Sequence, residues 1–113
     1  PINIFSLAYP ETTSNWSNRF QMFRTQNMWT FILLDSYNGR LWQVQYSTQD
    51  LDNLFCIPIN KYELVSDNEK CIFSIQPLTS MYQYYLINDN TGDMWKFQWS
   101  TKGDDYRWIE RFR

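Results

Sequence analysis

The chain contains no histidine, and we therefore ask first whether paired carboxylates could do acid–base chemistry. Histidine is the commonest general base in catalysis and the commonest metal ligand among side chains. Three carboxylate pairs could act in its place as a glycosidase acid and base: Asp50 with Asp52, Asp89 with Asp93, and Asp104 with Asp105. Each pair falls in a predicted loop, where acids are more often solvated than tuned to opposed roles. We therefore predict that the protein is not an enzyme and assign no catalytic residue.

A loop rich in oxygen-bearing side chains runs from Asn88 to Asp93 and is superficially similar to a calcium site. It lacks the downstream bidentate glutamate of such sites. The matching segment near residue 35 carries Arg40 where Asp93 stands, so a metal would bind only one of the two segments. We interpret both segments as turns, and we predict no metal and no cofactor.

Aromatic side chains are the strongest functional signal, with 8 Phe, 8 Tyr and 6 Trp in 113 residues. This number exceeds what a core of that size needs, and exposed Trp and Tyr favour protein interfaces or stacking on sugars. The candidates outside the expected core are Trp16, Tyr37, Tyr62 and Tyr85. We predict a non-catalytic module that binds a protein partner, with binding of a small ligand or glycan through exposed Trp and Tyr as the alternative.

Charge and hydropathy exclude two other classes of partner. The formal net charge of −2 and the pI near 4.9 give no basic field for phosphates, so nucleic acid is not expected. No apolar run approaches the roughly 20 residues that a membrane-spanning helix needs. The sequence gives no oligomeric state.

A duplicated unit must position these side chains. Residues 33–47 reappear as residues 86–100, an offset of 53 residues that aligns Gly39 with Gly92 and Trp42 with Trp95. The same offset aligns residues on either side of these segments. Two copies of one unit therefore make up most of the chain.

Each unit contains a hairpin whose strand pairing can be predicted. A loop from Ser36 to Gly39 places Leu33 opposite Trp42, and a loop from Asp89 to Gly92 places Leu86 opposite Trp95. In both hairpins every apolar pair then lies on one face, which a slip of one residue would destroy. Both glycines stand where a hairpin loop needs a positive φ. Shorter strands are expected at the flanks of the hairpins: 19–24 and 53–59 in the first unit, 71–76 and 106–112 in the second.

These patterns predict an all-β protein that forms a single domain over 1–113. We expect an N-terminal arm (1–18), a first repeat unit (19–59), a connector (60–70) and a second repeat unit (71–113). The two four-stranded antiparallel units should pack through their aromatic faces as one compact barrel or sandwich with an approximate internal two-fold axis. A pair of units arranged like propeller blades is the alternative.

The two cysteines do not occupy equivalent positions in the repeat. Cys56 and Cys71 are therefore not a duplicated metal pair. They could form one disulfide in an exported protein, or remain two buried free thiols.

The pattern Leu33-x-Asp35-x-x-x-Gly39-x-x-Trp42, with its second copy from Leu86 to Trp95, resembles an element of short uncharacterised bacterial proteins. That resemblance extends over about 19–109. Those proteins often carry an export signal, which implies a role in the bacterial envelope.

The two hairpins are also similar to the blade motif of quinoprotein-type β-propellers, although two blades cannot close a ring. Neither resemblance implies a catalytic residue or a cofactor. An export signal before Pro1 would place the protein in the periplasm or outside the cell, and without one we expect the cytoplasm.

Overall fold

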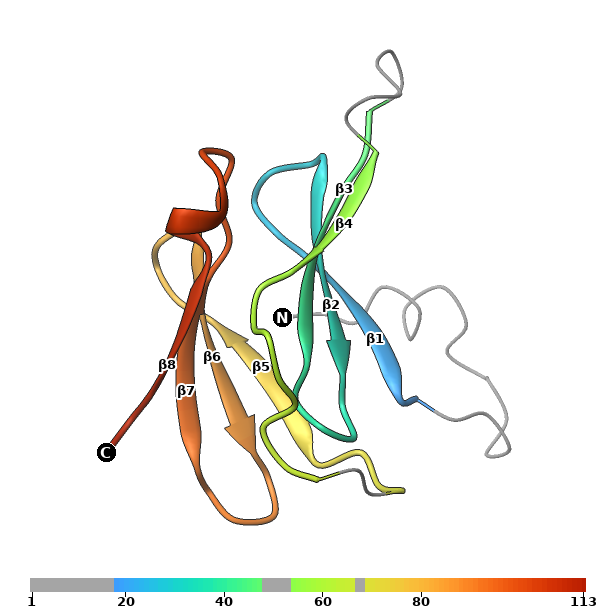
Figure 1. Cartoon of the computed structure of the whole chain (residues 1–113), viewed down its shortest axis with the longest axis vertical. Helices are drawn as coiled ribbons and strands as arrows, with labels where there is room; N and C mark the ends of the chain where they lie inside the picture. The colour runs from blue at the N-terminus through green and yellow to red at the C-terminus, as the bar shows by residue number, and fades with distance from the viewer. Residues whose placement is uncertain (1–17, 48–53, 67–68) are drawn as a thin grey trace.

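The computed structural model describes residues 18–47, 54–66 and 69–113, which form two four-stranded antiparallel sheets (Figure 1). The first sheet has the order β1 (Phe20–Arg24), β2 (Thr30–Asp35), β3 (Leu41–Gln45) and β4 (Phe55–Pro58). The second has the order β5 (Phe73–Pro77), β6 (Gln83–Asn88), β7 (Met94–Gln98) and β8 (Trp108–Arg111), with a 3-10 turn, η2 (Asp104–Tyr106), before β8. The all-β class and the two tandem four-stranded units are confirmed.

The strand register repeats with the same offset as the sequence. Leu33 pairs with Trp42 in the first sheet, and Leu86 pairs with Trp95 in the second, as predicted. The outer pairing follows too, because Trp42 faces Pro58 and Trp95 faces Arg111. Each sheet is thus the same meander, and both central hairpins turn at the same end of the molecule (Figure 1).

The central hairpins close in the same way in both units. Gly39 and Gly92 have φ of 83° and 80°, a conformation that residues with a Cβ rarely adopt. The amide of Gly39 donates to the carbonyl of Asp35 at 2.9 Å, and that of Gly92 donates to the carbonyl of Asn88 at 2.7 Å. The Asp35 and Asn88 side chains each accept an amide of their own loop, which stabilises both turns.

The core lies between the two sheets, and it joins opposite faces of the two units. The first unit contributes five buried apolar side chains to this core: Phe23, Ile32, Leu34, Leu41 and Ile59. The second contributes seven: Phe73, Ile75, Tyr84, Leu86, Trp95, Phe97 and Trp99. The aromatic face of the second unit is therefore buried as predicted, whereas the first unit buries its reverse face.

The prediction that both aromatic faces meet is wrong for the first unit. A two-fold axis would bury the same face of both units, whereas the core takes the reverse face of the first sheet and the aromatic face of the second. The reason lies in the reverse face, which carries the aliphatic residues Ile32, Leu34 and Leu41 in the first unit. Polar residues that share this face led us to expect a wetter surface, but its most central glutamine, Gln43, is itself buried and hydrogen-bonded.

Gln43 joins the two sheets through buried hydrogen bonds. Its Nε2 donates to the Ser100 carbonyl at 2.9 Å, and its Oε1 accepts the Ser100 amide at 3.1 Å. The Nε of Arg107 donates to the same Oε1 at 2.7 Å. We call this arrangement of Gln43, Ser100 and Arg107 the polar clamp.

Both cysteines are free and exposed, so the expectation of buried thiols is wrong. Cys56 pairs with Val44 in the sheet register and shares the outward face of the first sheet.

Within the described residues, no helix has the length and apolar character needed to cross a membrane.

Candidate functional site

The outward face of the first sheet is a broad apolar surface. Residues opposite one another in the register share a face, so one row runs across the sheet through Met22, Leu33, Trp42 and Pro58. We call the following seven side chains the first-sheet outer face: Phe20, Met22, Phe31, Leu33, Trp42, Val44 and Tyr46. All are half-buried except Phe20, which is 53% exposed.

Ring contacts hold this surface in place. Tyr46 stacks on Phe31 at 5.8 Å between ring centroids and meets the edge of Trp29 at 5.2 Å. The Arg40 guanidinium lies 4.9 Å from the ring centroid of Trp42. Such contacts add to the stability that burial of the rings provides, and they favour the observed positions of the rings.

An ion pair fixes one margin of this surface. The Nε and one terminal nitrogen of Arg19 each donate to a different carboxylate oxygen of Asp35 at 3.0 Å. The guanidinium of Arg19 also lies over the rings of Phe20 and Tyr37, at 5.2 and 4.8 Å from their centroids. Asp35 therefore orients the arginine that supports two aromatic side chains.

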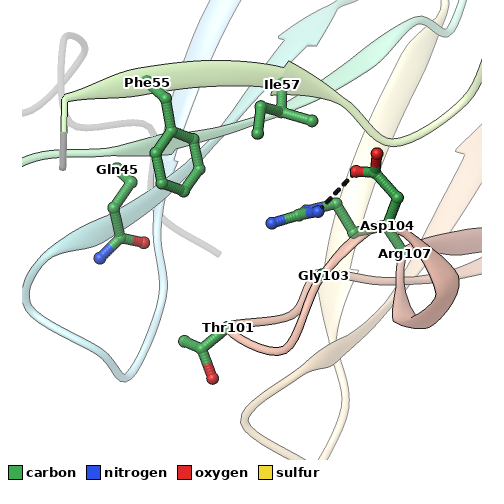
Figure 2. A pocket seen from close by; sticks show the side chains of 7 residues that line it. All are labelled: Gln45, Phe55, Ile57, Thr101, Gly103, Asp104 and Arg107. Carbon is green, nitrogen blue, oxygen red and sulfur yellow. Dashed lines mark hydrogen bonds and ion pairs between the residues drawn. The ribbon is translucent and has the colours of Figure 1, made fainter. Parts of the chain in front are cut away.

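A pocket of about 390 Å³ lies at the seam between the sheets (Figure 2). Gln45, Phe55 and Ile57 line it from β3 and β4. Its lining from the second unit is Thr101, Gly103, Asp104 and Arg107. Figure 2 shows the Arg107 side chain between these two walls, joined to Asp104.

The charged groups of this pocket are bonded to the protein. Arg107 donates to Asp104 at 2.7 Å, to Gln43 at 2.7 Å and to the Ser100 carbonyl at 3.1 Å. The Oε1 of Gln45 accepts the hydroxyl of Thr30 at 2.8 Å. The pocket is thus the outer end of the polar clamp, and its charges hold the two sheets together.

The structure does not gather the four predicted site residues into one site. Tyr37 lies in the β2–β3 loop, and Tyr62 is exposed in the connector that contacts this loop through Leu64 and Asn38. Tyr85 lies on the outward face of the second sheet, with its ring 5.6 Å from that of Phe112. Trp16 lies outside the described residues.

The carboxylates take part in local ion pairs and turns. Asp89 accepts the hydroxyl of Ser74, and Asp104 pairs with Arg107. Hydrogen bonds from Thr91 and Arg111 lower the pKa of Asp93 below its ordinary value. The pair Asp50 and Asp52 lies outside the described residues.

The search for metal-binding groups and the comparisons with known proteins assign no function to the site. Among residues 18–47, 54–66 and 69–113, no group of three or more Cys, Asp or Glu side chains is placed to hold a metal ion. Comparison of the chain with protein-family models, curated proteins and solved structures finds no match.

Sequence reasoning missed the first-sheet outer face because it assigned that face to the core. One signal could have revealed it. Ile32, Leu34 and Leu41 make the reverse face of the first hairpin as apolar as its aromatic face. A sheet that is apolar on both sides needs two partners, and the second unit supplies only one.

Proposed function

We propose that this protein is a non-catalytic interaction module that binds a protein partner through the first-sheet outer face. The supporting observation is the exposure of Phe20, 53%, at the margin of an apolar surface that spans the sheet. Contiguous exposed apolar surface marks interaction sites in soluble proteins. Aromatic side chains that are already held by neighbours make effective anchors, since little side-chain entropy is lost on binding.

The seam pocket supports this function less well than the sheet surface does. Its arginine already has three protein partners, so a ligand would have to displace bonds that join the two units.

The proposal also includes a location. The resemblance of the repeated motif implies that the partner is met in the bacterial envelope.

Capture of a partner from a native lysate of the source organism tests the proposal. The immobilised protein should retain a partner saturably, and Val44→Lys should reduce that retention roughly tenfold or more, because it places a charge at the centre of the apolar surface. Thr79→Lys, in the exposed loop between β5 and β6, is the matched control and should retain the partner fully. Equal retention by both variants contradicts the proposal.

Glycan binding is the second candidate, and the contact between Arg40 and Trp42 favours it. The guanidinium lies over the indole ring, so hydrogen-bond donors stand next to an aromatic side chain, and sugar sites combine these two features. Titration of tryptophan fluorescence against an oligosaccharide panel tests it. A saturable change that Trp42→Phe abolishes supports glycan binding, and a flat response across the panel contradicts it.

A further inference from the structure

We propose that the first-sheet outer face binds a second copy of this chain, which contributes the outward face of its second sheet. This inference rests on the proposed function, because it names the partner of the same surface. The second-sheet outer face consists of the outward side chains of that unit: Ser74, Gln76, Gln83, Tyr85, Ile87, Met94, Lys96, Gln98, Trp108, Glu110 and Phe112. The contact between copies would repeat the contact that already exists between the two sheets within one chain.

The existing contact buries one face of each sheet and leaves the equivalent face of the other sheet outside the core, where most of its side chains are half-buried. Phe73 is 3% exposed in the core, whereas its repeat equivalent, Phe20, is 53% exposed. Ile59 is 6% exposed, whereas its equivalent, Phe112, is 46% exposed. Each outer face therefore has a buried counterpart whose partner is known.

The side chains on the first-sheet outer face match those of the core. Seven residues of the second unit form its half of the core, and all seven have apolar equivalents in the first unit. In chain order these equivalents are Phe20, Met22, Phe31, Leu33, Trp42, Val44 and Tyr46. A face with this composition already packs against a sheet in this protein.

The second-sheet outer face matches the other half of the core nearly as well. Ile32, Leu34, Leu41 and Ile59 correspond to Tyr85, Ile87, Met94 and Phe112, which are all apolar or amphipathic. Phe23 is the exception, since Gln76 takes its place.

The two hairpin glycines differ in their surroundings, and this difference supports binding of a second copy independently. A Cβ on Gly39 would lie 3.0 Å from the ring of Phe73, which packs onto it from the other unit. A Cβ on Gly92 would meet nothing within 4 Å. Phe20, the repeat equivalent of Phe73, is the side chain that a second copy would bring to that open position.

The polar clamp does not carry over to the contact between copies. Lys96 replaces Gln43, and Leu54 replaces Arg107, so the bonds to the Ser100 backbone have no counterpart. The contact between copies should therefore be weaker than the internal one and depend on concentration. It is also head-to-tail, so each added copy offers a new face, and assembly continues to a ring or a filament.

Two variants, each blocking one face, test this geometry in the purified protein. Val44→Lys blocks the first-sheet outer face, and Ile87→Lys blocks the second-sheet outer face at a half-buried position. The mass of the unmodified protein, measured by light scattering, should rise with concentration past that of a dimer. Each variant alone should remain monomeric, and an equimolar mixture should roughly double in mass and stop there, because each partner keeps one complementary face.

Other outcomes contradict the proposal. Self-association of Ile87→Lys alone would mean that two first-sheet outer faces bind each other. A monomer at every concentration would mean that no second copy binds. If that monomer still captures a partner from lysate in a manner that Val44→Lys abolishes, the interaction module stands and only the identity of its partner is wrong.

The native cysteines provide a test that needs no substitution. Cys56 lies on the outward side of β4 beside Val44, and Cys71 lies exposed before β5 as an internal reference. Although Cys56 is exposed as a residue, partial desolvation of its sulfur raises the pKa of the thiol. The labelling rate of each thiol is therefore compared with its own rate at other protein concentrations. Labelling of Cys56 should slow as the protein is concentrated, while labelling of Cys71 keeps its rate. An unchanged ratio between dilute and concentrated protein contradicts the proposal.

Discussion

Residues at equivalent positions of the two units bond to different partners because the residues around them differ. Asp35 orients Arg19 and accepts the Tyr37 amide, whereas Asn88 serves only its own loop among the bonds described. The aspartate is buried in an ion pair, so removing it would take two hydrogen bonds from the Arg19 guanidinium. Asn88 has no arginine to orient, because Ile72 stands in the second unit at the position equivalent to Arg19.

The two hairpin glycines provide a matched pair of substitutions. Gly92→Ala should lower the free energy of unfolding by about 1 kcal/mol, since the only penalty is the positive φ. Gly39→Ala should lower it by about 2 kcal/mol or more, because the added Cβ also meets Leu64 at 2.9 Å and the Phe73 ring. Chemical denaturation of both variants measures the difference. Equal losses would mean that the packing of Phe73 on Gly39 is absent in solution.

At the scale of the strands, register was predictable, but the inward face of the first sheet was not. Turn chemistry at Gly39 and Gly92 and the alternation of side chains fix which residues lie opposite each other, and both are local properties. They do not determine which side of β2 and β3 meets another sheet, because both sides are apolar. Burial of Gln43 was also missed, since a glutamine is normally assigned to solvent unless its partners are known.

Gln43 should contribute more to stability than a surface glutamine does. Gln43→Leu keeps the size of the side chain but leaves the Ser100 amide and the Arg107 Nε without an acceptor. We expect the free energy of unfolding to fall by about 3 kcal/mol. Lys96→Leu, at the equivalent position of the second sheet, is the control and should change it by less than about 1 kcal/mol. Thermal denaturation of both variants checks this, and similar losses would argue against the polar clamp.

At the scale of the whole molecule, the two sheets share one buried core. All twelve residues of the buried apolar core belong to the contact between the sheets, so neither sheet has a separate buried core of its own among the described residues. Separating the sheets would therefore expose the main apolar surface of both at once. The structure favours unfolding in a single transition.

Truncation of one core residue tests this cooperativity. Leu34→Ala should lower the free energy of unfolding by about 3 kcal/mol, because Leu34 is fully buried in the contact. Hydrogen exchange should then speed up in both sheets together. Ile87→Ala, at the equivalent half-buried position, should have an effect of roughly 1 kcal/mol. Faster exchange confined to the first sheet of Leu34→Ala would contradict a shared core.

The sequence by itself determined the strands, their register, the hairpin turns and the duplication, because each depends on residues close in the chain or on one repeated pattern. Only the tertiary structure decided that the first sheet buries its reverse face, that the polar clamp joins the two sheets, and that an aromatic face remains outside. The physical reason is that the first sheet is apolar on both sides, so either side could meet the second sheet with similar burial. The choice depends on side-chain fit and on partners such as Gln43 and Ser100, which lie 57 residues apart.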